Sequence, residues 1–386
     1  PKQVLWAEWQ GQQIPFFFDK SVPASLLSIQ EKSVIIQAEI IASAFYLLSG
    51  WQEYFSDVRD LFGRYPYKES VQQQYGFVEV PVVNYYFDIL KTAIEQAYQL
   101  KLKRKLWPEH SFATCITHDI DRLNSAWKVW GTEALKAGNI KSFLKLFSQK
   151  WLKNDVWNNL EEVQQTVEKY GACSTFFFLS SQDKFNNHPA ADYAITSPEV
   201  KNQLKKLATA GHEIGVHGSF GTATDLKRFL TQIQKISQKT VGNRFHYLIY
   251  EPKKTPQVLE EAGLRYDSTL GFAEHFGFRN SYCFPFQPYD FENKKPHHYI
   301  EIPLNLMDTT LLPHYLNIQP QEVLAKVKPM LQQIEKFGGC FTLLWHNEHL
   351  ANQEQQGKYV LEQLLQYCKS HGTGFYLCRE VTGAGV

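Results

Sequence analysis

The sequence predicts an α/β protein, a barrel of parallel strands alternating with helices, preceded by a smaller N-terminal α/β domain. Two observations predict this fold class. From Ser111 onward, apolar runs of strand length alternate with amphipathic stretches of helical period, and repeated units of this kind place parallel strands side by side. Before Ser111 this alternation is absent, and helical stretches and an aromatic-rich loop take its place. We therefore predict an accessory domain over residues 1–110 and a barrel domain over residues 111–386.

The N-terminal region is predicted to hold two helices. Apolar periodicity places the first near Glu31–Ser49 and the second at about Asn84–Leu102. The aromatic loop Gly63–Tyr67 lies between them. The second helix is expected to end in the basic run Lys101–Lys105. Positive charge suits the last turn of a helix, so we interpret this run as a solvated helix end and not as a nucleic-acid patch.

The barrel region presents strands and helices in turn. The expected strands are Phe112–Thr117, Ser174–Leu179, His212–His217, His246–Tyr250, Tyr299–Pro303, Cys340–Trp345 and Phe375–Cys378. The expected helices are Trp157–Tyr170, Pro198–Ala210, Asp225–Ser237, Thr255–Ala262, Gln321–Phe337 and Tyr359–His371. Ser197 has the side chain of an N-cap, and Pro198 fits a first helical turn. The stretch Gly271–Pro296 is long and irregular, and loops of that kind are often functional.

Composition excludes several classes of protein. The 386 residues are 44% hydrophobic and 20% charged, which suffices for a large core and excludes wholesale disorder. The formal net charge is +1, so the whole chain offers no electrostatic case for nucleic acid or an anionic membrane as its main partner. The aromatic content of 15% is interpreted mainly as core, with an aromatic surface for stacking on sugars as the alternative.

Membrane spans and secretion are not indicated. The longest apolar stretch, Val34–Gly50, is interrupted by polar residues, whereas a span needs ~20 mostly apolar residues. No signal-peptide pattern is visible, although the start at Pro1 rather than Met leaves a removed segment open. The six cysteines form no Cys-x-x-Cys pair, which argues against a zinc ribbon or a redox motif. We expect a reduced, cytoplasmic setting.

Charged and imidazole side chains recur where the predicted strands end. Asp119 and Asp121 follow the first strand, His217 closes a later one, Arg244 stands beside the next, and His346 follows the strand Cys340–Trp345. The active site of a parallel barrel lies at the carboxyl ends of its strands, so we expect these side chains to meet. Carboxylates and imidazoles are the groups that bind a divalent metal and transfer protons.

The two aspartates can play different chemical roles. Asp119 and Asp121 are two residues apart, so in an extended chain they project to the same side. One carboxylate can bind a metal while the other takes a proton from water, whose pKa a metal lowers toward ~7. Paired carboxylates repel each other, so a cation is needed, from the metal or from Arg244. For the Asp-x-Asp motif alone, the alternative interpretation is a solvated turn. The charged and imidazole groups at the other strand ends favour a metal-binding active site.

Several segments together resemble the NodB-like polysaccharide deacetylases, and more closely the branch with an added N-terminal domain and a Thr-His-Asp-x-Asp first motif. The segments that carry the resemblance are THDID, STFFFLS, AGHEIGVHGS, NRFHYL, LEEAGLRYDSTLGF and FTLLWHNEH, with FYLLSGWQEY and GRYPY before them. The resemblance implies an irregular (β/α) barrel of about seven strands. It also implies metal-dependent hydrolysis of an N-acetyl group on a sugar.

The resemblance implies catalytic roles residue by residue. Asp119 matches the catalytic base, and Arg244 matches the arginine that orients this base. His346, after a leucine-rich strand, matches the general-acid histidine. Tyr247 lies where contacts to the substrate oxyanion are expected.

The implied metal set departs from the family pattern. Asp121 matches the metal-binding aspartate and His217 the first histidine of His-x-x-x-His, but the second histidine is replaced by Gly221. A catalytic zinc uses three protein ligands and a water. We expect His246 as the replacement, because residues 244 and 246 point to the same side of an extended chain. The alternatives are His118, His314 or a degenerate metal site.

We therefore predict a metal-dependent hydrolase of carbon–nitrogen amide bonds that deacetylates an N-acetylated sugar or polysaccharide precursor, with zinc as the expected divalent metal. One alternative is a hydrolase of a non-sugar amide such as a cyclic imide. Another is a metal-free barrel that serves as a glycan-binding or assembly module, which Gly221 would favour. If the protein is an enzyme, we expect its partner to be a carbohydrate or another small amide substrate. We expect no nucleic-acid partner and no membrane span.

Overall fold

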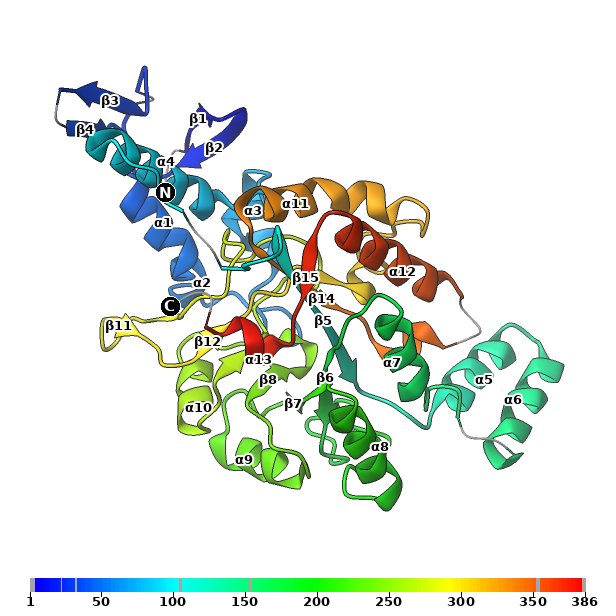
Figure 1. The fold of residues 1–386 in the computed structure, drawn as a ribbon. Helices are drawn as coiled ribbons and strands as arrows, with labels where there is room; N and C mark the ends of the chain where they lie inside the picture. The colour runs from blue at the N-terminus through cyan, green and yellow to red at the C-terminus, as the bar shows by residue number, and fades with distance from the viewer. Residues whose placement is uncertain are drawn as a thin grey trace.

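The computed structural model describes residues 4–21, 23–31, 33–103, 106–152, 155–351 and 355–383. Residues before the barrel form two antiparallel hairpins and a set of helices (Figure 1). The strands are β1 (Leu5–Trp9), β2 (Gln12–Phe16), β3 (Leu27–Gln30) and β4 (Ser33–Ile36). The helices are α1 (Ile40–Leu48), α2 (Trp51–Tyr54), α3 (Val71–Gln74) and α4 (Val82–Tyr98), with a 3₁₀ turn at Tyr67–Glu69.

Two expectations for this region are wrong in detail. The helix expected from Glu31 begins only at Ile40, because Ser33–Ile36 pairs with β3 as a strand. Three consecutive β-branched residues in that segment favour the extended chain. The second helix ends at Tyr98, where Gln99 adopts a left-handed conformation with φ of 52°. The basic run therefore lies beyond the helix, and its Arg104 and Lys105 lie outside the described residues.

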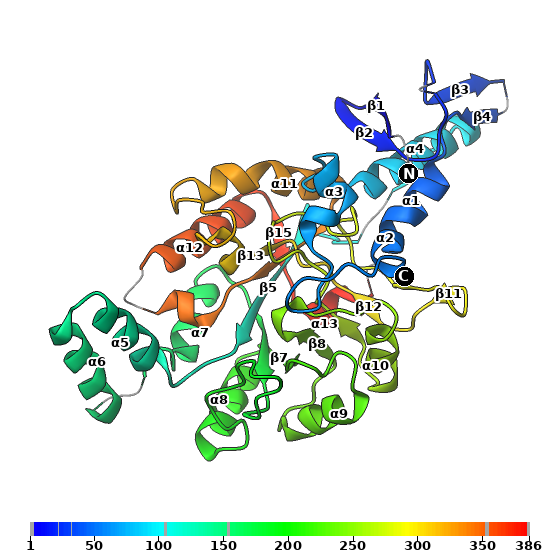
Figure 2. The ribbon, with the colours of Figure 1, turned by 180° about the vertical axis from the view of Figure 1, so that it is seen from behind.

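A parallel sheet forms the centre of the molecule (Figures 1 and 2). Its strands are β5 (Phe112–Ile120), β6 (Thr175–Leu179), β7 (Glu213–Gly218), β8 (Gly242–Phe245), β9 (Tyr266–Asp267), β12 (Ile300–Glu301), β13 (Leu306–Met307), β14 (Cys340–Leu344) and β15 (Thr373–Phe375). They pair in the order β12-β9-β8-β7-β6-β5-β14-β13, with β15 on β5. The sheet has nine strands where about seven were expected, and no pairing among the described residues joins β12 to β13. The barrel is therefore irregular and open.

Helices surround this sheet, and the first two of them project from it as a hairpin (Figure 1). They are α5 (Ala126–Lys136), α6 (Ile140–Leu152), α7 (Leu160–Glu168), α8 (Pro198–Thr209), α9 (Leu226–Lys235), α10 (Thr255–Glu261), α11 (Val323–Phe337), α12 (Gln355–Ser370) and α13 (Cys378–Val381). Ser197 caps α8 through a bond from the backbone N–H of Val200, as expected. No helix among the described residues is both long enough and apolar enough to cross a bilayer.

One expected strand is displaced in a way that matters for the site. The strand expected over His246–Tyr250 lies instead at Gly242–Phe245, and His246–Leu248 forms a 3₁₀ turn. Tyr247 and Leu248 both have positive φ, at 61° and 56°, which ends the extended chain. Residues 244 and 246 therefore do not share one extended strand. His246 nevertheless lines the cavity, and the buried Arg244 donates a hydrogen bond to Asp119, which lines the same cavity.

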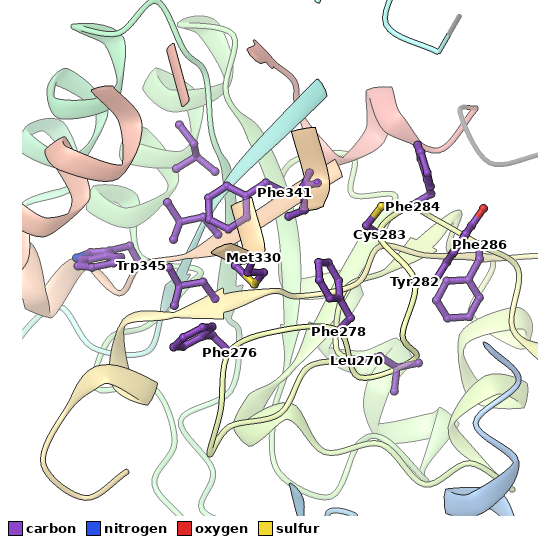
Figure 3. Close-up of a cluster of buried hydrophobic side chains, with 14 of the residues drawn as sticks. Leu270, Phe276, Phe278, Tyr282, Cys283, Phe284, Phe286, Met330, Phe341 and Trp345 are labelled. Carbon is purple, nitrogen blue, oxygen red and sulfur yellow. The ribbon is translucent and has the colours of Figure 1, made fainter. Parts of the chain in front are cut away.

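The long segment Gly271–Pro296 is mostly core rather than a free loop. It contains the short hairpin β10 (Tyr289–Asp290) and β11 (Lys295–Pro296), and its Phe276 and Phe278 are buried. Figure 3 shows side chains of this segment gathered in one cluster with those of α11 and β14. Arg279 of the same segment forms a buried ion pair with Glu53 of α2. The segment thus joins the N-terminal region to the barrel, while the boundary at residue 110 remains a prediction.

Candidate metal centre

Three predicted ligands lie together at the carboxyl end of the sheet. His217 closes β7, Asp121 follows β5, and His246 stands in the turn after β8. His217 Nε2 lies 3.3 Å from Asp121 Oδ1, and His246 Nε2 lies 3.4 Å from Asp121 Oδ2. One ligand atom from each of the three residues lies within 4.8 Å of the others. Their spacing fits a single metal ion.

The chemistry of these donors also fits a metal. His217 Nδ1 donates to the backbone carbonyl of Arg244 at 2.7 Å, which leaves the lone pair of Nε2 directed at Asp121. Asp121 Oδ1 is buried and accepts no well-formed hydrogen bond. Burial alone would raise the pKa of Asp121, but His246 and His217 hold this pKa well below its ordinary value. One ionised carboxylate and two imidazoles form a donor set that zinc uses in sites with an open position.

Position 221, where the sequence resemblance implies a second histidine, does not readily accept a side chain. Gly221 has φ of 85°, a conformation that residues with a Cβ rarely adopt. A Cβ built there would lie 2.7 Å from ring atoms of Phe185. The guanidinium carbon of Arg228 lies 4.1 Å from the centre of that same ring and holds it in place. The loop after β7 is therefore shaped around a glycine.

The other predicted metal candidates lie apart from the three ligands. His118 is buried, with Nδ1 2.8 Å from the carbonyl of Trp345 and Nε2 3.2 Å from Ser174 Oγ. His314 lines the cavity but offers no atom to the cluster among the described residues.

Arg244 holds Asp119 in a fixed position. Its Nη1 donates to Asp119 Oδ1 at 3.0 Å and to Thr117 Oγ1 at 2.7 Å. Its Nε and Nη2 donate to the carbonyl and hydroxyl of Ser268, and the side chain is fully buried above the ring of Phe177. The second oxygen of Asp119 lies 3.6 Å from His217 Nε2 and faces the three candidate ligands.

His346 lies across the cavity from these groups and contacts a carboxylate that the sequence did not reveal. Its Nδ1 donates to Asp308 Oδ1 at 2.7 Å, and its backbone N–H donates to Oδ2 at 2.6 Å. The Nε2 atom lies 3.8 Å from Asp121 Oδ2. Burial lowers the pKa of His346, but the charge and hydrogen bond of Asp308 outweigh burial and raise this pKa to about 10.

Asp308 also accepts a hydrogen bond from a second imidazole. His349 Nδ1 donates to Asp308 Oδ2 at 2.8 Å, so one carboxylate holds both His346 and His349. Asp308 follows β13 directly, in the sequence Leu-Met-Asp. This is the same signal that pointed to Asp119, an acid after an apolar strand, but β13 has only two residues and its apolar pattern is weak.

The cavity in front of these groups has a volume of about 380 Å³ and takes one wall from the N-terminal region. Phe62 stacks on the ring of Tyr247 with centroids 5.0 Å apart, and both line the cavity. Arg64 donates to the backbone carbonyl of Tyr247 at 3.2 Å and pairs with Asp60 at 2.7 Å. The sequence singled out Tyr247 but not Phe62 or Arg64, because no local pattern shows which distant loop covers a barrel.

Comparison with known proteins gives one family model that matches the N-terminal region, and distant similarities to solved structures. Residues 1–99 match a family described as "Family of unknown function (DUF7033)". No curated protein matches the chain.

Among solved structures, the chain is similar to a protein of Mycobacterium smegmatis assigned as a polysaccharide deacetylase. Their identity is 16% and their TM-score 0.47, over 72% of this chain and 91% of that one. A protein of Pseudomonas aeruginosa PAO1 with the same assignment has 13% identity and a TM-score of 0.48, over 74% and 95%. An allantoinase has 13% identity and a TM-score of 0.48, over 75% and 95%. Similarity at this level does not identify a substrate.

Proposed function

We propose that the chain is a metal-dependent hydrolase that cleaves a carbon–nitrogen amide bond, with an N-acetylated sugar as its substrate class. The observation that carries the proposal is the convergence on one cavity of three groups of residues. These are a candidate three-ligand metal set, a carboxylate clamped by a buried arginine, and a histidine held by its own carboxylate. A binding module needs the cavity but neither a clamped base nor a protonated acid.

The metal would be held by Asp121, His217 and His246. When bound, a divalent ion supplies positive charge that polarises a carbonyl oxygen and lowers the pKa of a water molecule toward ~7. The fixed tautomer of His217 keeps Nε2 available as a ligand without a rearrangement.

Asp119 would act as the general base. Arg244 occupies one carboxylate oxygen and leaves the other facing the cluster, where it can accept a proton from the attacking water. The guanidinium bonds to Ser268 and Thr117 fix the arginine, so the carboxylate is oriented before substrate arrives. Arg244 is therefore a positioning residue.

His346 would protonate the departing amine. Its raised pKa keeps the ring protonated at neutral pH. Asp308 accepts the hydrogen bond from Nδ1–H, which leaves Nε2–H directed at the cavity. The aromatic wall formed by Phe62 and Tyr247 supports a sugar-sized substrate, because aromatic faces pack well against the apolar faces of sugar rings.

The proposal is tested by metal analysis together with acetate release. Purified protein loaded with zinc is incubated with chitin oligosaccharides, and free acetate is measured. We expect bound zinc and acetate release, and we expect Asp119→Asn to keep the zinc but lose the activity. Protein that retains no zinc, or an Asp119→Asn variant with normal turnover, would contradict the proposal.

A further inference from the structure

The helical hairpin formed by α5 and α6 projects from the barrel (Figures 1 and 2). Its base is anchored, because Asp155 accepts from the backbone N–H of Ala126 at 3.3 Å and Trp130 packs against Trp157 with ring centroids 5.7 Å apart. The two helices approach closely at Gly131, where a Cβ would lie 3.3 Å from the ring of Phe143. The hairpin is thus a packed unit fixed at one end, and no substrate or catalytic group assigned above lies on it.

Its outer side carries an exposed apolar ridge. Ile140, Leu144 and Phe147 of α6 are spaced by four and three residues, which places them on one face of the helix. Ile140 is 63% exposed and Leu144 is 58% exposed, and Leu135 at the end of α5 is exposed as well. Leaving this many large apolar side chains in water on one hairpin indicates that another surface covers them.

Lysines flank this ridge. Residues 126–148 contain Lys128, Lys136, Lys141 and Lys145, all exposed, and Glu133 as their one acidic side chain. The net charge of +1 for the whole chain conceals this local excess. The hairpin therefore combines an apolar ridge with an excess of positive charge, and in α6 Lys141 and Lys145 directly follow the ridge residues Ile140 and Leu144.

We propose that the α5–α6 hairpin binds an anionic lipid bilayer, with Ile140 and Leu144 entering the headgroup region and the lysines contacting lipid phosphates. An amphipathic helix with a narrow apolar face and lysines beside it has the composition of an interfacial membrane helix. A protein partner fits less well, because lysine is depleted in protein–protein interfaces.

The placement of the hairpin orients the molecule on such a surface. The hairpin follows the carboxyl end of β5, the strand that carries Asp119, so the membrane-binding element and the cavity belong to the same end of the sheet. The proposal goes beyond hydrolysis and does not depend on it, because lipid binding is measured without substrate or metal.

Co-sedimentation with vesicles tests this surface. The full chain is mixed with vesicles of phosphatidylcholine alone or with phosphatidylglycerol added. We expect binding only to the anionic vesicles, decreasing with salt. The double variant Ile140→Glu, Leu144→Glu should lose at least tenfold in binding, while Ile29→Glu, which alters a residue 67% exposed on β3, should bind normally. Lys141→Gln and Lys145→Gln should each weaken binding about fivefold.

Other outcomes would overturn the proposal. They are no binding to anionic vesicles, equal binding to both vesicle types, or undiminished binding by the folded double variant. A dimer in light scattering that the double variant abolishes, without vesicle binding by the original chain, would assign the ridge to contact between two copies. Circular dichroism verifies that each variant is folded, and the conservative pair Ile140→Ser, Leu144→Ser replaces a glutamate variant that fails to fold.

Discussion

Asp308 accepts hydrogen bonds from both the ring and the backbone of His346, at 2.7 Å and 2.6 Å. A carboxylate in this arrangement fixes the orientation of the imidazole and determines which nitrogen faces the cavity. It also stabilises the charged ring, and the pKa of His346 rises to about 10 although burial opposes this change. The acid proposed for the reaction is therefore a pair of residues.

The Asp308→Asn variant should separate two effects of Asp308 on His346, the hydrogen bond that orients the ring and the negative charge that raises its pKa. The amide retains a hydrogen bond acceptor but loses the negative charge, so the pKa of His346 should fall. In the pH profile of kcat, the alkaline limb should move to lower pH, with a rate loss of up to ~10²-fold at neutral pH. His349→Gln is the matched control, because it removes the other imidazole bound to Asp308 and should leave the alkaline limb nearly in place. An unmoved limb in Asp308→Asn would assign the general acid to another residue.

His246→Ala should weaken metal binding, because it removes one of the three candidate ligands. We expect zinc affinity to fall by at least ~10-fold, since losing a residue that merely supports a ligand already costs this much. Competition with a chromogenic chelator measures the change. His314→Ala is the control, because His314 lines the same cavity without belonging to the cluster. Equal zinc affinity in both variants would remove His246 from the ligand set.

Phe62→Ala should raise KM and leave kcat and zinc content nearly unchanged. The ring stacks on Tyr247 and lines the cavity without contacting the metal cluster or Asp119 among the described contacts. One aromatic stacking contact is worth ~0.5–1.5 kcal/mol, which corresponds to a rise in KM of about 2- to 12-fold. Leu61→Ala alters the neighbouring side chain, which is 97% exposed, and should leave KM unaltered. A loss confined to kcat would show that Phe62 acts on the chemical step.

The buried carboxyl pair Asp267 and Glu301 should make folding stability depend on pH. Burial raises the pKa of Asp267 to about 6 and that of Glu301 well above its ordinary value. Groups whose pKa is higher in the folded state contribute stability below the unfolded pKa, and this contribution is lost as pH rises through the folded pKa. The free energy of unfolding should therefore decrease from about pH 4 to pH 7, by roughly 1–3 kcal/mol from this pair.

Urea denaturation at several pH values, compared between the original chain and Glu301→Gln, isolates the contribution of this pair. The amide has the size of the carboxyl group and does not ionise, so the variant should show a weaker dependence on pH. Identical slopes in the two proteins would mean that the pair does not titrate in this range.

Much of the fold follows from sequence patterns of strand length and helical period. The alternation after Ser111 predicts the parallel sheet, and the acids and histidines at strand ends predict which side chains meet at its carboxyl edge. Two-residue strands such as β9 and β13 leave no such pattern, so the strand count was too low and Asp308 was missed. The turn at Tyr247 was not predicted, because bulky aromatic residues rarely adopt a positive φ.

The sequence also did not predict how distant segments of the chain pack against the barrel. The contribution of Phe62 to the cavity depends on where a loop from residues 59–67 crosses the barrel, and local periodicity carries no information about that crossing. The hairpin of α5 and α6 was likewise not predicted. Some of its apolar residues, such as Phe147, contact the partner helix and others, such as Ile140, face solvent, so the helical period is less distinct.

The loop around Gly221 has an evolutionary consequence. A histidine at position 221 would be strained, because its Cβ would lie 2.7 Å from ring atoms of Phe185 and its backbone would have a φ of 85°. Phe185 in turn packs against the guanidinium of Arg228, so a side chain at position 221 would disturb both residues. If His246 serves as the third ligand, this arrangement is entrenched. Lineages with this arrangement would keep a histidine after β8 for as long as the ring of Phe185 packs against Gly221.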